Sequence, residues 1–115
     1  MRVAPVGTTT VERVAQSVIH VPQKQKIDVL ADLLNSPAMT RTLVFTRTKH
    51  GADKLVKGLA AKKHVASAIH GNKSQGQRER ALSEFKSGKS PVLIATDIAA
   101  RGIDVDGVSH VVNYD

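Results

Sequence analysis

The sequence predicts an α/β fold in which a mainly parallel β-sheet is flanked by helices. Short apolar runs such as Val92–Ala95 alternate with amphipathic patterns of about 10–15 residues, which is typical of βαβ units. Polar residues gather directly after three of the apolar runs. A parallel sheet places its ligand site at the carboxyl ends of its strands, so these polar stretches predict a site at one edge.

The first part of the chain contains a predicted linker and the first strand. Residues 1–10, MRVAPVGTTT, hold proline, glycine and three threonines, and we expect a linker there, with residues 11–115 forming one domain. Apolar and polar residues roughly alternate in Val14–Val21, which predicts a strand.

Two amphipathic helices and one buried strand follow. Residues 25–34 are predicted to be helical and to end at Asn35–Pro37, and Thr42–Phe45 reads as a buried strand. A second helix is predicted within residues 51–63. The apolar faces at helical spacing are Ile27, Leu30, Ala31 and Leu34 in the first helix and Ala52, Leu55, Val56 and Leu59 in the second.

The remaining elements complete the alternation. Residues 64–71 predict a strand, and Ser74 with Gln77 forms a capping box that opens a third helix. This helix runs through Phe85 and closes at Gly88, as a helix C-terminus should. Val92–Ala95 and His110–Tyr114 are the last two predicted strands.

Composition narrows the class of protein. A chain of 115 residues with 41% hydrophobic residues is about one globular domain, and only three aromatics (Phe45, Phe85 and Tyr114) predict an aliphatic core. Without cysteine there is no disulfide or cysteine-based metal site, and the five histidines show no ligand spacing. No apolar stretch reaches the roughly 20 residues of a membrane span and no signal peptide is evident, so we expect a cytoplasmic protein without a membrane partner.

The charge favours a polyanionic partner. Seventeen basic residues against ten acidic ones give a formal net charge of +7. Nucleic acid is the first candidate partner, while a basic surface that is merely solvated explains the charge equally well.

The first polar stretch, Thr46–Lys49, lies at a strand-to-helix turn. Its two threonine hydroxyls, the cations Arg47 and Lys49, and the N–H groups of the following helix would suit a phosphate. Ordinary helix capping by Thr48 beside solvated cations is an equally open interpretation.

The second stretch surrounds the predicted start of the third helix. Gly71 permits close backbone approach, and Gln75 and Arg78 share one helix face. An arginine in the first turn opposes the helix dipole, which favours a functional role. The alternative is that Arg78 and Arg80 pair with Glu79 or Glu84 on an exposed face.

The third stretch is ATDIAARGID, residues 95–104. Small residues let a large ligand or a second domain come close, Asp104 suits a pair of sugar hydroxyls, and Thr96 suits a phosphate. Arg101 would bridge to acids elsewhere, whereas Asp97 is interpreted as a local turn or helix cap.

In this order and at this spacing, the three stretches resemble the second RecA-like domain of the DEAD-box RNA helicases. LVFTRTKHGAD resembles motif IV of that family, Gln75 to Arg78 its Q-x-x-R motif and ATDIAARGIDV its motif V, while HVVNYD resembles the strand that follows. The resemblance covers about residues 12–115, and the motif sequences resemble most those of the bacterial RhlE-like group.

The resemblance implies roles for individual residues. The RNA backbone would be contacted by Arg47, Thr48, Gly71, Gln75, Arg78 and Thr96. Gly102 and Asp104 would reach the ATP ribose, and Arg101 would link this domain to the N-terminal RecA-like domain. The intact enzyme would use ATP with magnesium to unwind short RNA duplexes locally, with RNA as its partner.

The chain departs from a complete helicase in several ways. It has no phosphate loop of the pattern G-x-x-x-x-G-K-[ST], no D-E-A-D sequence to hold magnesium, and no arginine-rich motif after Tyr114. We therefore expect a partial second domain that holds no catalytic residue or metal ligand and is inactive alone.

Two other classes of protein could share this α/β pattern. A non-enzymatic RNA- or protein-binding module could be built on the same half-fold. A flavodoxin-like small-molecule enzyme lacks support, because no acid–base pair or nucleophile–base arrangement is visible. An exposed sheet edge could also recruit another copy of the chain.

Overall fold

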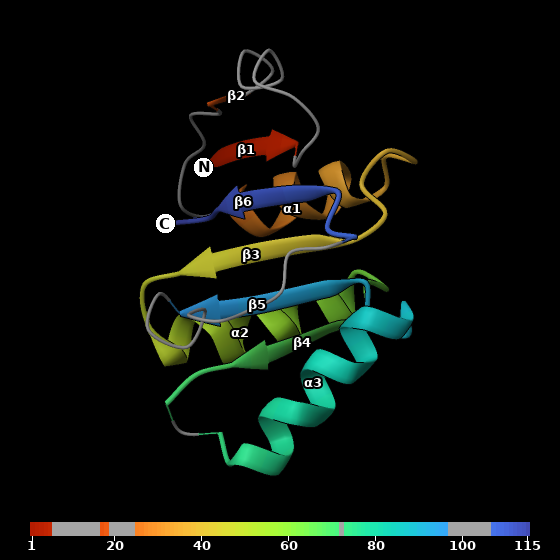
Figure 1. Cartoon of the computed structure of the whole chain (residues 1–115). Helices are drawn as coiled ribbons and strands as arrows, with labels where there is room; N and C mark the ends of the chain where they lie inside the picture. Colours follow the sequence, from red (N-terminus) through yellow and green to blue (C-terminus); the bar gives the residue numbers. More distant parts are fainter. Residues whose placement is uncertain (6–16, 19–24, 72, 97–106) are drawn as a thin grey trace.

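The computed structural model describes residues 1–5, 17–18, 25–71, 73–96 and 107–115, which form a six-stranded sheet with three helices (Figure 1). The strands are β1 (Arg2–Pro5), β2 (Ser17–Val18), β3 (Thr42–Thr46), β4 (Ala66–Ile69), β5 (Val92–Thr96) and β6 (His110–Asn113). The helices are α1 (Lys26–Leu34), α2 (Lys49–Ala61) and α3 (Gln75–Ser87).

The sheet is mainly parallel, as predicted. Its order is β2-β1-β6-β3-β5-β4, and the four strands from β6 to β4 run parallel to one another. Along the chain, α2 lies between β3 and β4, and α3 lies between β4 and β5. This alternation of parallel strands and crossover helices confirms the predicted α/β class.

The N-terminal residues contain a strand that the sequence did not predict. Residues 1–10 were predicted to be a linker, but Arg2–Pro5 form β1, which pairs antiparallel with β6 and aligns Val3 with Val112. Val3 is buried in the core, and this long-range contact has no local signal in a stretch rich in turn-forming residues. Of the strand predicted at Val14–Val21, Ser17–Val18 is a strand beside β1, and the other residues lie outside the described part.

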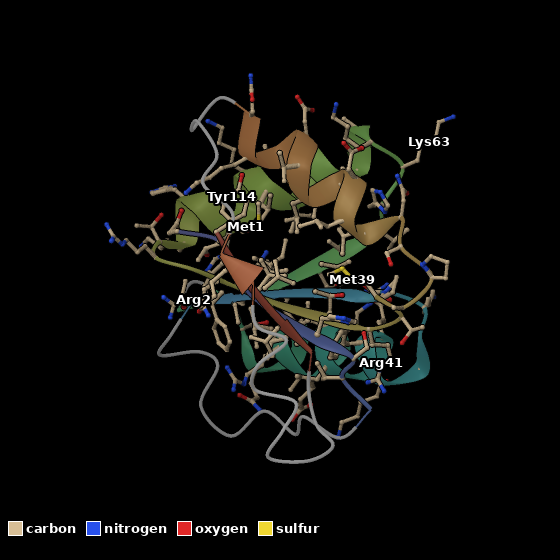
Figure 2. All side chains as sticks on the ribbon, turned by 90° about the horizontal axis from the view of Figure 1, so that it is seen from above. Met1, Arg2, Met39, Arg41, Lys63 and Tyr114 are labelled. Carbon is tan, nitrogen blue, oxygen red and sulfur yellow. The ribbon has the colours of Figure 1, made fainter. Side chains whose placement is uncertain are left out.

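Two hydrophobic clusters form on opposite faces of the sheet because successive strand side chains point in opposite directions. On one face Val44 and Ile94 pack with Leu55 and the other buried residues of α1 and α2. On the other face Leu93 packs with α3 residues that include Phe85. Figure 2 shows α1 and α2 on one side of the sheet and α3 on the other.

Local capping signals fix the ends of the helices that lead to the site. Thr48 caps α2, since its Oγ1 accepts a hydrogen bond from the Gly51 amide at 3.0 Å. Ser74 and Gln77 form the predicted capping box of α3. Gly88 ends α3 with a φ of 84°, a left-handed conformation that glycine adopts without the steric cost of a side chain.

The predicted apolar helix faces are turned toward the sheet. Ile27 and Leu34 at the rim of α1 are half-buried, as is Val56 on α2. The fully buried members of the two predicted faces are Leu30 and Ala31 on α1 and Ala52, Leu55 and Leu59 on α2. The helical periodicity therefore identified which side of each helix faces the core.

Phe85 offers a test of the smaller cluster. Its side chain is only 1% exposed, and the Arg41 guanidinium lies 4.8 Å from the ring centroid. We expect Phe85→Ala to lower the free energy of unfolding by about 3–5 kcal/mol, because it leaves a cavity in the core. Urea denaturation measures this, with Leu82→Ala on the half-buried rim of the same helix as the matched control. Equal losses in the two variants would contradict the assignment of Phe85 to the core.

Candidate nucleic-acid interface

The parallel register brings the polar stretches to one edge of the sheet. Thr46 at the end of β3 is aligned with Thr96 at the end of β5, and Ile69 of β4 is aligned with Ala95. The stretches that begin at Thr46, His70 and Thr96 therefore start side by side. Within the third stretch, residues 97–104 lie outside the described part, and they include the predicted site residues Arg101, Gly102 and Asp104.

The hydroxyl groups of both threonines in the Thr46–Lys49 stretch form hydrogen bonds within the chain. Thr46 is buried and its Oγ1 donates to the Thr48 carbonyl at 3.4 Å, while the Thr48 hydroxyl caps α2. The capping interpretation of Thr48 is thus confirmed. The Arg47 amide donates to Asp115 Oδ2 at 2.7 Å, which leaves the exposed Arg47 side chain pointing out from a fixed backbone.

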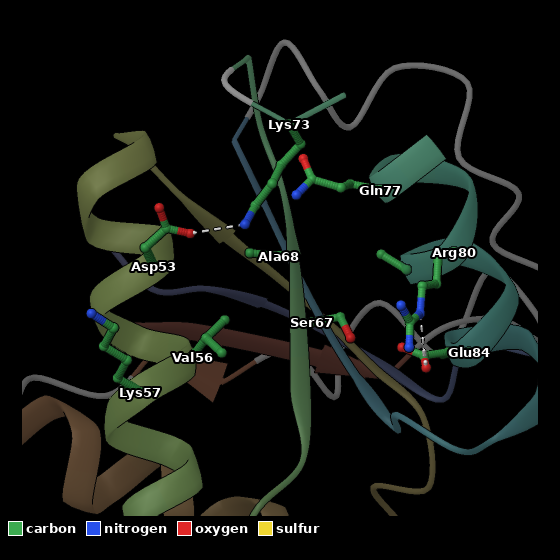
Figure 3. A pocket seen from close by; sticks show the side chains of 10 residues that line it. Asp53, Val56, Lys57, Ser67, Ala68, Lys73, Gln77, Arg80 and Glu84 are labelled. Atoms are coloured by element: carbon green, nitrogen blue, oxygen red, sulfur yellow. Dashed lines mark ion pairs between the residues drawn. The ribbon is translucent and has the colours of Figure 1, made fainter. Parts of the chain in front are cut away.

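The loop between β4 and α3 is anchored to α2 by a cluster that the sequence did not reveal. His70 is buried, with its side chain only 3% exposed, and its Nε2 lies 3.0 Å from Asp53 Oδ1. Lys73 Nζ approaches the same oxygen at 3.7 Å, as Figure 3 shows. The Lys73 amide also donates to the His70 carbonyl at 3.0 Å, which closes a turn around Gly71. Asp53 and His70 are 17 residues apart, so no spacing rule for a single helix or turn would pair them.

The charges in this cluster act on Asp53. Partial burial works to raise the pKa of its carboxyl group, but the hydrogen bond to His70 and the electrostatic attraction of His70 and Lys73 outweigh burial. The net effect lowers the pKa of Asp53 below its ordinary value of 3.8. Asp53 therefore carries its charge at neutral pH and contacts both His70 and Lys73 of the loop.

Gly71 and the first turn of α3 face solvent next to this anchor. A Cβ added at Gly71 would meet no atom within 4 Å, so its backbone is open to a ligand. Gln75 is exposed and its Nε2 donates to Glu79 Oε1 at 3.2 Å, while Arg78 is half-buried. The alternative of ion pairing along α3 holds for Arg80, whose Nε lies 3.8 Å from Glu84 Oε2.

The end of β6 adds a mixed polar and aromatic group to the same edge. Tyr114 is buried, and Lys26 Nζ lies 5.2 Å from its ring centroid and donates to its carbonyl at 2.9 Å. Burial, with the nearby Asp115 charge, raises the pKa of the Tyr114 hydroxyl to about 12. This residue therefore stays neutral at physiological pH.

The electrostatics of the edge suit a chain of phosphates. Both α2 and α3 begin here, so their N-terminal N–H groups add positive potential to the cations Arg47, Lys49, Lys73 and Arg78. Among the described residues no group of three or more potential metal ligands occurs. Within the same residues, no helix has the length and apolar character that crossing a membrane requires. The charge of this edge is therefore complementary to that of an anionic polymer.

Comparisons with known proteins agree with this geometry. Residues 25–115 match the family model of the helicase conserved C-terminal domain. The Escherichia coli DEAD-box protein SrmB, solved bound to the regulator of ribonuclease activity A, is 36% identical with a TM-score of 0.67, over 70% of this chain and 48% of that chain.

Two further structures are similar. Saccharomyces cerevisiae Dbp5, solved bound to RNA and ADP BeF3, is 39% identical with a TM-score of 0.72, over 80% of this chain and 24% of that chain. A DEAD box protein from Methanococcus jannaschii is 40% identical with a TM-score of 0.66, over 75% of this chain and 23% of that chain.

The chain thus spans about half the length of the SrmB chain and about a quarter of the other two. Its mixed sheet and flanking helices match the RecA-like C-terminal domain of these proteins. The chain belongs to the family of helicase conserved C-terminal domains, and within it to the DEAD-box proteins.

Proposed function

We propose that this chain is the RNA-binding part of the second RecA-like domain of an ATP-dependent RNA helicase. The observation that carries the proposal is the register of β3, β5 and β4, which gathers cations and two helix N-termini at one edge. Membership of the helicase C-terminal domain family supports the proposal, and the similar protein Dbp5 has been solved bound to RNA. Within the DEAD-box proteins, we place the chain in the RhlE-like group on its sequence motifs.

RNA would lie along this edge and contact the protein through its phosphates. Gln75 and Arg78 project from the first turn of α3, and Gly71 offers an unobstructed backbone beside them. Arg47 and Thr96 would extend the path across β3 and β5, with Thr48 contributing through the turn that it caps. Such contacts hold the backbone without reading bases, so binding would be independent of sequence.

The ATP site would be completed by the residues after β5. Asp104 and Gly102 would meet the ribose, and Arg101 would reach acidic residues of an N-terminal RecA-like domain. ATP with magnesium would supply the phosphoryl-transfer chemistry, with the magnesium ligands outside this chain. On its own the chain would hydrolyse no ATP, because nothing in its sequence positions the γ-phosphate.

Arg78 tests the RNA contact. We expect Arg78→Ala to weaken binding of single-stranded RNA severalfold and to reduce the slope of log affinity against log salt by about 0.7, the loss of one phosphate contact. Fluorescence anisotropy with two unrelated RNA sequences over a salt series measures both quantities. Arg80→Ala is the matched control from the same helix. Sequence-selective binding, or equal salt slopes in the two variants, would contradict phosphate recognition by Arg78.

Asp104 tests the nucleotide contact. We expect Asp104→Ala in the intact parent enzyme to lower RNA-stimulated ATP hydrolysis, while the stability of the 115-residue chain changes by no more than about 0.5 kcal/mol. Phosphate release measures ATP hydrolysis, with the 115-residue chain alone as the blank, and thermal melting measures stability. Asp106→Ala, which removes the same charge two residues away, is the matched control. If Asp104→Ala unfolds the chain but leaves the parent's rate per folded molecule unchanged, Asp104 is structural.

Asp53 gives a pH-dependent test of the anchored loop. Its pKa is lowered in the folded state, so its stabilisation is present above about 3.8 and is lost as the pH falls through the folded value. We expect Asp53→Asn to lower the free energy of unfolding at pH 7 by less than about 1 kcal/mol, since the side chain is 46% exposed. Urea titrations should show this difference shrink in more acidic buffer. The control is Asp32→Asn, at an exposed position of α1. A difference between wild type and Asp53→Asn that persists below the folded pKa would show that the charge of Asp53 does not hold the loop.

A further inference from the structure

A groove runs along the outer side of β4 and meets the proposed RNA edge at Lys73. β4 is the last strand of the described sheet and pairs only with β5 among the described strands. Helices α2 and α3 flank it from opposite faces of the sheet and leave a groove of about 510 Å³ between them (Figure 3). The row of N–H and C=O groups on the unpaired side of β4 therefore faces a space bounded by two helices.

The side chains of β4 leave this backbone accessible. Ala66, Ser67 and Ala68 are small and half-buried, and none is a proline or a charged residue of the kind that protects many sheet edges. Val65, directly before the strand, is 59% exposed, and it is the one exposed large hydrophobic among the described side chains. Val56 lies on the groove wall, whereas Val65 lies just beyond the residues that line the groove, where a segment paired along β4 would reach it.

The charges of the groove select the partner. Each of its two acids has a lysine partner within the chain, since Asp53 contacts Lys73 and Glu84 contacts Lys89. Lys57 on the α2 wall forms no ion pair with another described residue. On the α3 wall the Arg80 side chain is 80% exposed. Its Nε lies 3.8 Å from Glu84 Oε2, a long and solvent-screened contact that leaves its charge accessible to a partner. Both walls therefore present a cation to an incoming chain.

We propose that the β4 edge is a docking site for an extended acidic segment of a partner protein, which adds to the sheet as a further strand. Main-chain hydrogen bonds to β4 supply affinity, and side chains supply specificity. Successive residues of a strand point to opposite faces, so two adjacent acidic residues meet Lys57 on one wall and Arg80 on the other. β4 has four residues, which limits the paired segment to a short one.

The proposal does not depend on the proposed RNA contacts, although Lys73 lies at both surfaces. The probe is a short fluorescein-labelled peptide in which valine and threonine flank two adjacent glutamates. We expect it to bind the 115-residue chain. A version with lysines in place of the glutamates, or with N-methylated backbone amides, should bind much more weakly because it loses the charges or the main-chain donors.

Two lysines on one helix provide the matched variants. Lys57→Glu should weaken peptide binding about tenfold or more, since it puts like charges together, and it should lower RNA affinity no more than Lys54→Glu does. Lys54 is also exposed on α2 but lines a different hollow, so Lys54→Glu makes the same change of net charge outside the groove and should leave peptide affinity nearly unchanged. Val65→Ser should also weaken the peptide, and thermal melting checks that each variant is folded.

Several results would overturn the proposal. Failure of the glutamate peptide to bind, or binding that is insensitive to N-methylation, rules out strand addition. Equal losses for Lys57→Glu and Lys54→Glu show only general attraction of an acidic peptide to a basic protein. Self-association that Lys57→Glu abolishes in sedimentation experiments assigns the edge to a second copy. Displacement of the peptide by single-stranded RNA, with RNA binding selectively weakened in Lys57→Glu, assigns the groove to RNA.

Discussion

The parallel alignment of β3 with β5 is the constraint on which the other features depend. It sets Thr46 opposite Thr96, and the pairing of β5 with β4 then places the end of β4 at the same edge. Both crossover helices must begin where their preceding strands end, so the N-termini of α2 and α3 gather there as well. A shift of register by one residue would turn Val44 and Ile94 away from α1 and α2 and dissolve both clusters. The core and the candidate interface are therefore fixed by the same hydrogen bonds.

The candidate interface combines a rigid base with exposed cations. Thr48 and Ser74 use their hydroxyls to cap helices, and Asp53 ties His70 and Lys73 to α2. These groups hold the turn positions, while Arg47, Gln75 and the open backbone of Gly71 face solvent. An interface of this kind suits a regular phosphate backbone, because the spacing of its donors is set by the sheet and not by flexible loops.

The strand order also separates two surfaces by their chemistry. The carboxyl edge collects helix N-termini and favours an anionic polymer, whereas the outer side of β4 has no partner among the described strands and faces a groove between two helices. Asp53 borders both, since it anchors the β4–α3 turn and lines the groove. A partner bound along β4 would therefore lie close to the residue that positions the proposed RNA contacts, and the two surfaces can be tested independently because Lys57 belongs only to the groove.

Local patterns predicted the helices, their apolar faces, the Ser74–Gln77 capping box and the strands at Thr42, Val92 and His110, because periodicity and capping act within a few residues. The sequences of its motifs also resemble those of the DEAD-box family. Arg2–Pro5 form a strand through pairing with β6, which lies at the other end of the chain, so no local pattern predicted it. The same holds for the Asp53–His70 contact and for the terminal place of β4. Strand pairing and contacts between elements are long-range, so no local pattern encodes them.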